Sequence, residues 1–301
     1  MDGAAAPAVS ATSDDRLPGS VHSGTVRRVR ASYQERGMGP MTRHSRHTRI
    51  LELAAERGEV TVDELVAELD TSPATVRRDL VELASQQLVT RTRGGARTTA
   101  VAYDLPLRYK SARRADEKHR IAAHAVSLLQ PGDVVGLNGG TTTTMVAEGI
   151  ATDADLQGLR DGERLTVVTN AVNIAHDLTV RSHVRIIVTG GTARTRSYEL
   201  VGPLAVHTLT QVTIDVAFLG VDALDAEHGG MAFHEGEAEI SRLMGRAARR
   251  TVVVADSTKL GERALAPFAD PAAISLVVTT TEADPEQVAA LRDAGIEVAV
   301  V

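Results

Sequence analysis

Seven short apolar runs between residues 133 and 301, separated by helical patterns, constrain the fold of this chain more than any other feature. They are rich in Val, Ile and Leu and occupy residues 133–138, 165–169, 184–189, 215–220, 251–256, 274–280 and 296–301. Their apolar residues are nearly continuous rather than alternating, which is typical of strands buried on both faces of a parallel sheet. We therefore predict a Rossmann-like, mostly parallel α/β domain over residues 116–301.

A different pattern fills residues 41–97, where short helices and a hairpin are predicted. The helices are expected over residues 47–57 and 61–69 and from Ser72 onward, and the hairpin over residues 88–98. Thr61 and Glu64 have the spacing of a capping box, and Ser72 followed by Pro73 is typical of a helix start. Two helices joined by a tight turn and followed by a hairpin predict a winged helix-turn-helix domain.

The third of these helices has one apolar face and one outward face. Val76, Leu80 and Leu83 fall together, whereas Arg78 lies near the opposite side. We expect this outward face and the hairpin to bind double-stranded DNA, with base contacts from Arg78 and Thr75 and a phosphate contact from Arg77. The alternative is that the arginines only solvate a surface helix. The expected DNA-binding residues are Ser72, Ala74, Thr75, Arg77, Arg78, Arg91 and Arg93.

The distribution of charge supports this prediction, although the net charge of −6 does not. Residues 72–97 contain five Arg and two acids, and Arg43, Arg46 and Arg49 form a second cluster. Residues 98–301 contain 19 bases and 26 acids, so the negative excess lies in the larger domain. This segregation predicts a local basic face within the first domain.

The remaining segments predict a cytoplasmic protein without a membrane anchor. Residues 1–40 are expected to be a disordered tail and residues 98–115 a linker, followed by a helix over 116–129. No apolar run reaches the roughly 18 residues that span a bilayer. The chain has no cysteine, which excludes disulfides and thiolate metal sites.

No metal or cofactor is predicted from the sequence. His207, His228 and His234 match no metal-ligand spacing, so a surface or packing role is the favoured interpretation for them. Methionines and phenylalanines are too scattered to indicate a cofactor site.

Small and polar residues follow several predicted strands, at the edge where parallel sheets bind ligands. After the first strand comes NGGTTTTM, residues 138–145, whose glycines, hydroxyls and helix N–H groups could hold a phosphate. Asn170 and Asp222 could bind sugar hydroxyls, and Lys259 could complement a phosphate. Ordinary loop and cap roles explain each residue equally well, Asp256 and Ser257 in particular. The expected effector-binding residues are Asn138, Gly139, Gly140, Thr141, Thr142, Thr143, Asn170, Gly191, Asp222 and Lys259.

Residues 43–280 resemble the DeoR family of bacterial transcriptional regulators. The matching stretches are TVDELVAELDTSPATVRRDLVEL, RGGA, GGTTT, VTN, GGTARTRSYELVGPLA, DVAFLGVDAL and VVVADSTKLG. The resemblance implies a winged helix-turn-helix that binds operator DNA and a sensor domain similar to ribose-5-phosphate isomerase and glucosamine-6-phosphate deaminase. Two positions depart from the family pattern, which usually has an aspartate at Asn138 and a lysine at Ser241. Either departure could mean a different effector.

The favoured function is a repressor of carbohydrate catabolism that a phosphorylated sugar releases from its operator. Paired operator half-sites imply a homo-oligomer, a dimer or a tetramer. One alternative is a sugar-phosphate isomerase with a DNA-binding appendage, for which Asp222, Glu237 and Lys259 are the candidate catalytic groups. Another is a degenerate sensor that binds only DNA.

Overall fold

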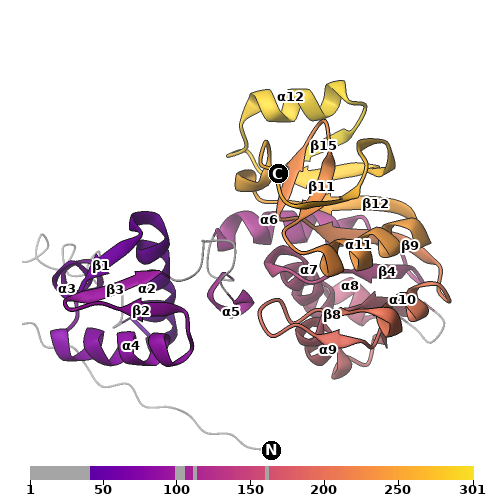
Figure 1. Ribbon diagram of the computed structural model, residues 1–301. Coiled ribbons are helices and arrows are strands. Elements are labelled where there is room, and N and C mark those ends of the chain that lie inside the picture. The colour runs from indigo at the N-terminus through magenta and orange to yellow at the C-terminus, as the bar shows by residue number, and fades with distance from the viewer. Residues whose placement is uncertain (1–40, 99–105, 111–113, 160–162) are drawn as a thin grey trace, which may run out of the picture. The chain divides into compact units, whose positions relative to one another are not determined.

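The computed structural model describes residues 41–98, 106–110, 114–159 and 163–301 (Figure 1). The expected tail, residues 1–40, and most of the expected linker lie outside the described residues. A short helix, α5 (Leu107–Lys110), lies within the expected linker and was not predicted.

The N-terminal domain consists of three helices and a small antiparallel sheet. The helices are α2 (Arg43–Arg57), α3 (Val62–Leu69) and α4 (Pro73–Ser85), and the strands are β1 (Glu59–Thr61), β2 (Val89–Arg91) and β3 (Gly95–Thr98). The sheet has the order β1-β3-β2, so the predicted hairpin is joined by a strand that the sequence did not predict. Ile50, Leu65, Val76 and Leu83 are fully buried between these elements. The winged helix-turn-helix prediction is confirmed.

Local capping determines where α3 and α4 begin. The Glu64 N–H donates to Thr61 Oγ1 at 3.2 Å while the Thr61 N–H donates to Glu64 Oε2 at 2.7 Å, which completes the capping box. The Thr75 N–H donates to Ser72 Oγ at 3.2 Å, and Pro73 occupies the first turn of α4. Asp70 adopts a left-handed conformation with φ 44° and ends α3. These contacts satisfy N–H groups that a helix end leaves free.

The larger domain is built on one parallel seven-stranded sheet of order β15-β14-β12-β9-β4-β5-β6. Its strands are β4 (Val134–Leu137), β5 (Leu165–Thr169), β6 (Val184–Val188), β9 (Ile214–Gly220), β12 (Ala248–Val254), β14 (Leu276–Thr279) and β15 (Glu297–Val300). Each corresponds to one predicted apolar run, so the fold-class prediction is confirmed. The strand order reverses between β4 and β9, which is where open parallel sheets bind their ligands.

Helices cover both faces of this sheet. They are α6 (Ala115–Ser127), α7 (Thr141–Thr152), α8 (Ala154–Gln157), α9 (Val172–Thr179), α10 (Pro203–Leu209), α11 (Glu235–Ala247) and α12 (Pro285–Asp293). Two small antiparallel additions were not predicted. One pairs β7 (Thr192–Ala193) with β8 (Leu200–Val201), and the other contains β10 (Ala223–Asp225), β11 (Gly229–Ala232) and β13 (Ala266–Ala269).

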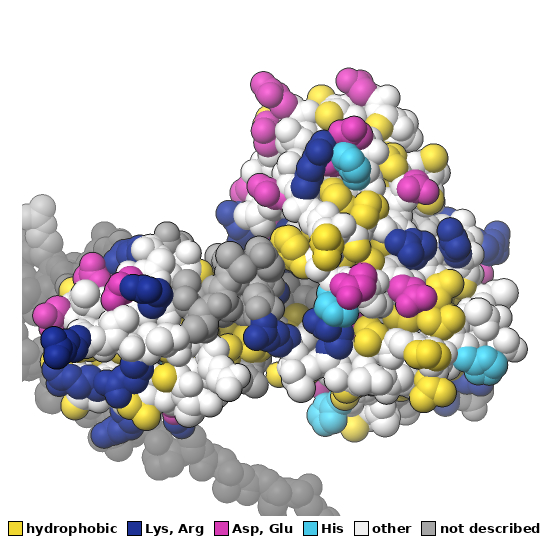
Figure 2. Space-filling model, viewed as in Figure 1, with side chains coloured by type: hydrophobic (Ala, Val, Ile, Leu, Met, Phe, Trp, Pro, Cys, Tyr) yellow, Lys and Arg dark blue, Asp and Glu magenta, His cyan; other side chains and the backbone are white. Residues whose placement is uncertain are grey.

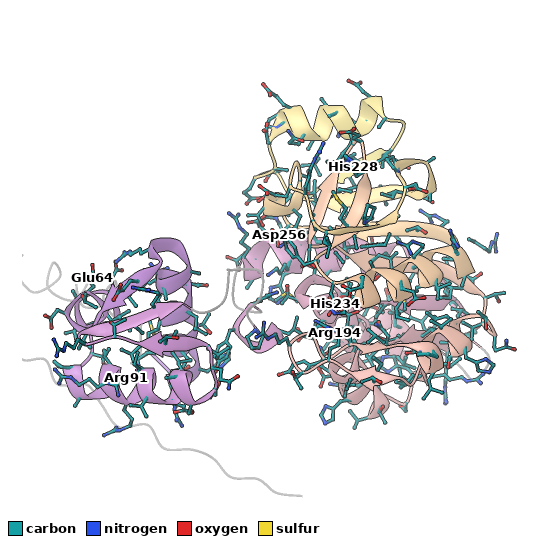
Figure 3. All side chains as sticks on the ribbon, viewed as in Figure 1. Glu64, Arg91, Arg194, His228, His234 and Asp256 are labelled. Carbon is teal, nitrogen blue, oxygen red and sulfur yellow. The ribbon has the colours of Figure 1, made fainter. Side chains whose placement is uncertain are left out.

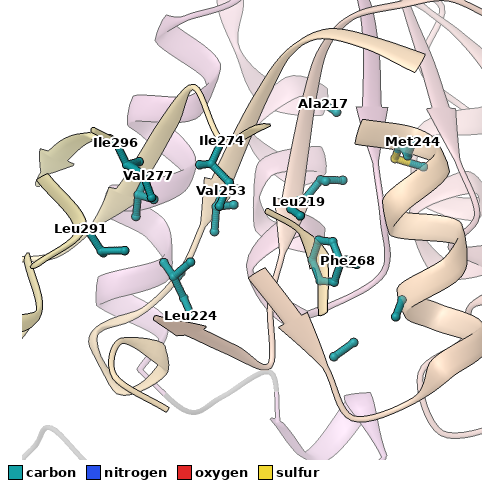
Figure 4. Close-up of a cluster of buried hydrophobic side chains, with 14 of the residues drawn as sticks. Ala217, Leu219, Leu224, Met244, Val253, Phe268, Ile274, Val277, Leu291 and Ile296 are labelled. Atoms are coloured by element: carbon teal, nitrogen blue, oxygen red, sulfur yellow. The ribbon is translucent and has the colours of Figure 1, made fainter. Parts of the chain in front are cut away.

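Alternate residues of the central strands enter two separate cores. Phe218 packs with α6, α7 and α9, whereas its neighbour Leu219 packs on the other face with Met244 and Phe268 (Figure 4). Both residues are fully buried. Strands with two buried faces require nearly continuous apolar sequence, which explains the pattern of the seven runs. Within the described residues, no helix is both long enough and apolar enough to span a bilayer.

Candidate functional site

The outward face of α4 carries two exposed arginines. Val76, Leu80 and Leu83 point into the domain core, whereas Arg77 and Arg78 are exposed. Within the described part of the chain, neither guanidinium makes a hydrogen bond or an ion pair. At the start of the same helix, the hydroxyls of Ser72 and Thr75 lie 2.9 Å apart. The N-terminal half of α4 therefore presents uncompensated positive charge next to a helix N-terminus, which suits a phosphate backbone.

The β2–β3 hairpin extends this basic surface. Arg91 and Arg93 are exposed and, among the described residues, have no charged partner, whereas Arg97 pairs with Glu59 at 3.4 Å. Figure 2 shows arginine side chains gathered over α4 and this hairpin, and Figure 3 labels Arg91 there.

The other arginine cluster does not form the basic face that its sequence suggests. Arg43 pairs with Glu82 of α4, and Arg49 lies 3.8 Å from Glu68 of α3. Arg46 Nε lies 2.8 Å from Asp79 Oδ2. These arginines therefore hold α2 to its neighbours instead of offering free charge.

Asp79 is the centre of that internal network. It is 2% exposed on α4 and accepts hydrogen bonds from Arg46 and from His47 Nε2, the latter at 3.1 Å. Burial lowers the pKa of His47, although the hydrogen bond to Asp79 opposes this shift. The buried carboxylate fixes α4 against α2 and so fixes the direction of its outward face.

A cleft of about 710 Å³ lies over the larger domain at the carboxyl ends of β4 and β9. Of the expected effector-binding residues, it is lined by Asn138, Gly139, Gly140, Thr141, Thr142, Asp222 and Lys259. Thr143, Asn170 and Gly191 do not line it. The Thr143 hydroxyl instead donates to the Gly140 carbonyl at 3.2 Å. Gly191 lies against the backbone of Val201, where an added Cβ would approach the Val201 oxygen to 2.7 Å.

The N-terminus of α7 opens into this cleft. Its N-cap, Gly140, has φ 137° and supplies no side-chain cap. In the described residues, no hydrogen bond engages the N–H groups of Thr141, Thr142 and Thr143. Three free N–H groups at the positive end of a 12-residue helix can bind an anion such as a phosphate.

Asn138 lines the cleft, but hydrogen bonds within the protein occupy its polar atoms. Its Oδ1 accepts from the Gly220 N–H at 2.8 Å, and its Nδ2 donates to the Gly220 carbonyl and to Ser241 Oγ, both at 3.0 Å. The amide thus joins the ends of β4 and β9 across the strand-order reversal. The two departures from the family pattern, which the sequence left unrelated, lie in direct contact.

Glu199 is a cleft residue that the sequence analysis did not single out. It is 5% exposed, and Asn170 Nδ2 donates to its Oε2 at 2.9 Å. The Gly139 N–H also donates to the carboxylate. Burial, with the nearby charge of Glu237 adding to it, raises the pKa of Glu199 to about 8. The side chain is therefore mostly uncharged at neutral pH, next to the proposed anion site.

Arg194, Ser197, His234 and Glu237 form a second polar group in the cleft. Arg194 Nε donates to Glu237 Oε1 at 2.8 Å, and the Ser197 hydroxyl donates to the same oxygen at 2.6 Å. Figure 3 shows Arg194 and His234 side by side. Arg194 and Ser197 lie in a turn between two very short strands, where periodicity offers no signal.

The candidate catalytic groups Asp222, Glu237 and Lys259 all reach the same cleft. Glu237 is engaged by Arg194 and Ser197, and Asp222 Oδ2 accepts from the Phe233 N–H at 3.0 Å. Among the described residues, no group of three or more His, Cys, Asp or Glu side chains could hold a metal ion. His228 contacts Asp225 at 3.1 Å.

Comparisons with known proteins match both parts of the chain. The model of the DeoR C-terminal sensor domain matches residues 113–281, and that of the DeoR-like helix-turn-helix domain matches residues 46–100. The HTH-type transcriptional regulator GlpR of Haloferax volcanii is 35% identical over 254 residues, covering 84% of this chain and 96% of that protein. The glycerol-3-phosphate regulon repressor of Escherichia coli is 30% identical over 239 residues, covering 79% of this chain and 91% of that protein. Among solved structures, ribose 5-phosphate isomerase A of Methanocaldococcus jannaschii overlaps with a TM-score of 0.36 at 17% identity, covering 48% of this chain and 54% of that one.

Proposed function

This chain belongs to the DeoR family of transcriptional regulators, and from this premise we propose that it represses genes of carbohydrate catabolism until a phosphorylated sugar occupies its cleft. The names of two relatives, a transcriptional regulator and a glycerol-3-phosphate regulon repressor, support repression in this branch of metabolism.

The exposed, unpaired guanidinium groups of Arg77 and Arg78 carry the DNA-binding part of the proposal. Ser72 and Pro73 set the start of α4, and Asp79 holds the helix against α2. Arg78 and Thr75 then read base edges in the major groove, and Arg77, Arg91 and Arg93 contact phosphates. Operators with two half-sites require at least a dimer, so the working form is a homo-oligomer.

The effector part of the proposal rests on the open N-terminus of α7. The N–H groups and hydroxyls of Thr141 and Thr142 bind the phosphate, and Lys259, which lines the same cleft, complements its charge. Asp222 binds a sugar hydroxyl. The contacts of Glu237 favour effector binding over catalytic turnover, because Arg194 and Ser197 already engage this candidate base.

A gel-shift assay on the intergenic DNA next to the gene tests the DNA-binding part. Wild-type protein is expected to form a discrete complex, and Arg77→Ala with Arg78→Ala is expected to abolish it. Arg185→Ala, in β6 of the larger domain, is the matched control and should bind as wild type does. A double variant that still forms the complex with unchanged affinity would contradict the placement of α4 on DNA.

Thermal shift with phosphorylated sugars tests the effector part. At least one of these compounds should raise the melting temperature of the wild type and weaken its DNA complex. Thr142→Ala should reduce both effects. Conversion of ribose 5-phosphate to ribulose 5-phosphate by the purified protein would instead support the isomerase alternative.

A further inference from the structure

The carboxyl group of Glu199 lies at the edge of the proposed anion site. The Gly139 N–H donates to this carboxyl, and a Cβ added at Gly139 would lie 2.6 Å from Glu199 Cδ. Only Gly140 separates Gly139 from Thr141, so the Cα atoms of Gly139 and Thr141 are at most about 7.6 Å apart. An anion at the N-terminus of α7 is therefore close enough to a charged Glu199 for the two to repel each other.

The surroundings of Glu199 disfavour its charged form. The side chain is 5% exposed, and its described hydrogen-bond donors are the neutral Asn170 amide, at 2.9 Å, and the Gly139 N–H. Two further carboxylates act on it, that of Glu237 on α11 and that of Asp222 after β9. Burial and repulsion between like charges both favour a protonated carboxyl group.

Basic side chains in the same cleft do not offset this effect. In the part of the chain that the structure describes, none of them makes a hydrogen bond or an ion pair with the Glu199 carboxyl. Two of them are paired elsewhere, Arg194 with Glu237 at 2.8 Å and Arg263 with Asp225 at 3.2 Å. The cleft also contains the ring of His234. The basic residues that line it are Lys110, Arg114, Lys118, Arg194, Arg196, Lys259 and Arg263. These residues attract an anion whether or not Glu199 is charged.

We propose that the cleft binds the anionic group of its effector together with one proton, and that Glu199 carries this proton. When Glu199 is protonated, the N-terminus of α7 and the basic residues attract the anion without opposition from its carboxyl. When Glu199 is ionised, its carboxylate repels the anion. The anion and the proton therefore strengthen each other's binding. This inference rests on the proposed function, because it takes the phosphate to lie at the N-terminus of α7.

Calorimetric titration of the full-length protein with inorganic sulfate tests the inference. Sulfate keeps both of its charges from pH 7 to pH 9, so any proton taken up on binding is carried by the protein. Because burial raises the pKa of Glu199 to about 8, the affinity should fall at least about fivefold between pH 7 and pH 9. At pH 8.5, buffers of different ionisation enthalpy should reveal uptake of about half a proton or more per sulfate. An affinity that is constant or rises over this range would overturn the inference.

Two variants assign the proton to a residue. Glu199→Gln stays uncharged, so its affinity should change less than about twofold over the same range. At pH 9 it should also bind sulfate more tightly than the wild type, a gain that a damaged fold would not produce. Glu262→Gln is the matched control, because it removes an exposed carboxyl that lines the same cleft, and it should keep the fall in affinity of the wild type.

The outcomes separate this inference from the proposed function. An equal fall in affinity for Glu199→Gln and the wild type would overturn the inference alone, since the anion would still bind. If neither sulfate nor inorganic phosphate binds the wild type at any pH, the effector part of the proposed function fails as well.

Discussion

The amide of Asn138 and the hydroxyl of Ser241 lie 3.0 Å apart and share a hydrogen bond, although 103 residues separate them. The family pattern places an aspartate and a lysine at these two positions. An aspartate and a lysine in this contact would form an ion pair, so the two departures replace one charged pair by one neutral pair. The net charge of the cleft is the same in both cases, and the departures do not by themselves imply a different class of effector.

A double-mutant cycle checks this pairing. Asn138→Asp should destabilise the larger domain by roughly 2–3 kcal/mol, because its carboxylate would face the Gly220 carbonyl without a charged partner. Adding Ser241→Lys should recover at least about 1 kcal/mol, measured by chemical denaturation. Strictly additive effects of the two substitutions would show that the positions do not form a pair.

The contact between Gly139 and Glu199 leaves no room for a side chain. A Cβ at position 139 would lie 2.2 Å from Glu199 Cγ. We expect Gly139→Ala to cost roughly 1–3 kcal/mol of stability and to abolish binding of inorganic phosphate. Gly94→Ala is the matched control, because nothing lies within 4 Å of its added Cβ. Wild-type phosphate affinity in Gly139→Ala would place the anion elsewhere.

The pKa of Glu199 predicts a pH dependence of stability. Burial raises this pKa from the usual 4.5 to about 8, so the folded state holds a proton that the unfolded state releases. The protonated Glu199 side chain therefore contributes to the stability of the folded state. This contribution is fully present below pH 4.5 and is lost as the pH rises toward 8. The Glu199→Gln side chain stays uncharged at every pH. Between pH 5 and pH 8 the melting temperature of this variant should therefore fall by at least about 2 °C less than that of the wild type. Parallel pH profiles of variant and wild type would contradict the assignment.

Salt dependence separates the free arginines of the hairpin from the paired one. Arg91→Ala and Arg93→Ala should each reduce the slope of log K against log salt for DNA binding by about 1, since each removes one phosphate contact. Arg97 is paired with Glu59, and Arg97→Ala should change the slope less. Fluorescence anisotropy at several salt concentrations measures all three, and equal slopes for the three variants would be inconsistent with the proposed interface.

The buried carboxylate of Asp79 should be essential for the N-terminal domain. Asp79→Asn leaves the Arg46 guanidinium, which is 16% exposed, without its ionic partner, and should cost roughly 3 kcal/mol. Asp63→Asn, on the exposed first turn of α3, should change stability by less than about 0.5 kcal/mol. Urea denaturation followed by circular dichroism compares the two, and similar midpoints would argue against a role for Asp79 in fixing α4.

Local sequence was sufficient to predict most of the elements that position the two sites. The start of α4 follows from Ser72 and Pro73, and the seven sheet strands follow from apolar runs that can be buried on two faces. Both signals arise within a few residues along the chain, where capping and periodicity act. The short strands β1, β7 and β8 escaped prediction because two or three residues are too few for a period to show.

The sequence by itself thus determined the fold class, the helix-turn-helix and the glycine- and threonine-rich turn of the cleft. Only the tertiary structure decided which charges are available. Arg46 is neutralised by a residue 33 positions away, and Arg194 meets His234 from 40 positions away. Coulombic attraction and desolvation depend on distance in space and on burial, and neither can be read from positions along the chain.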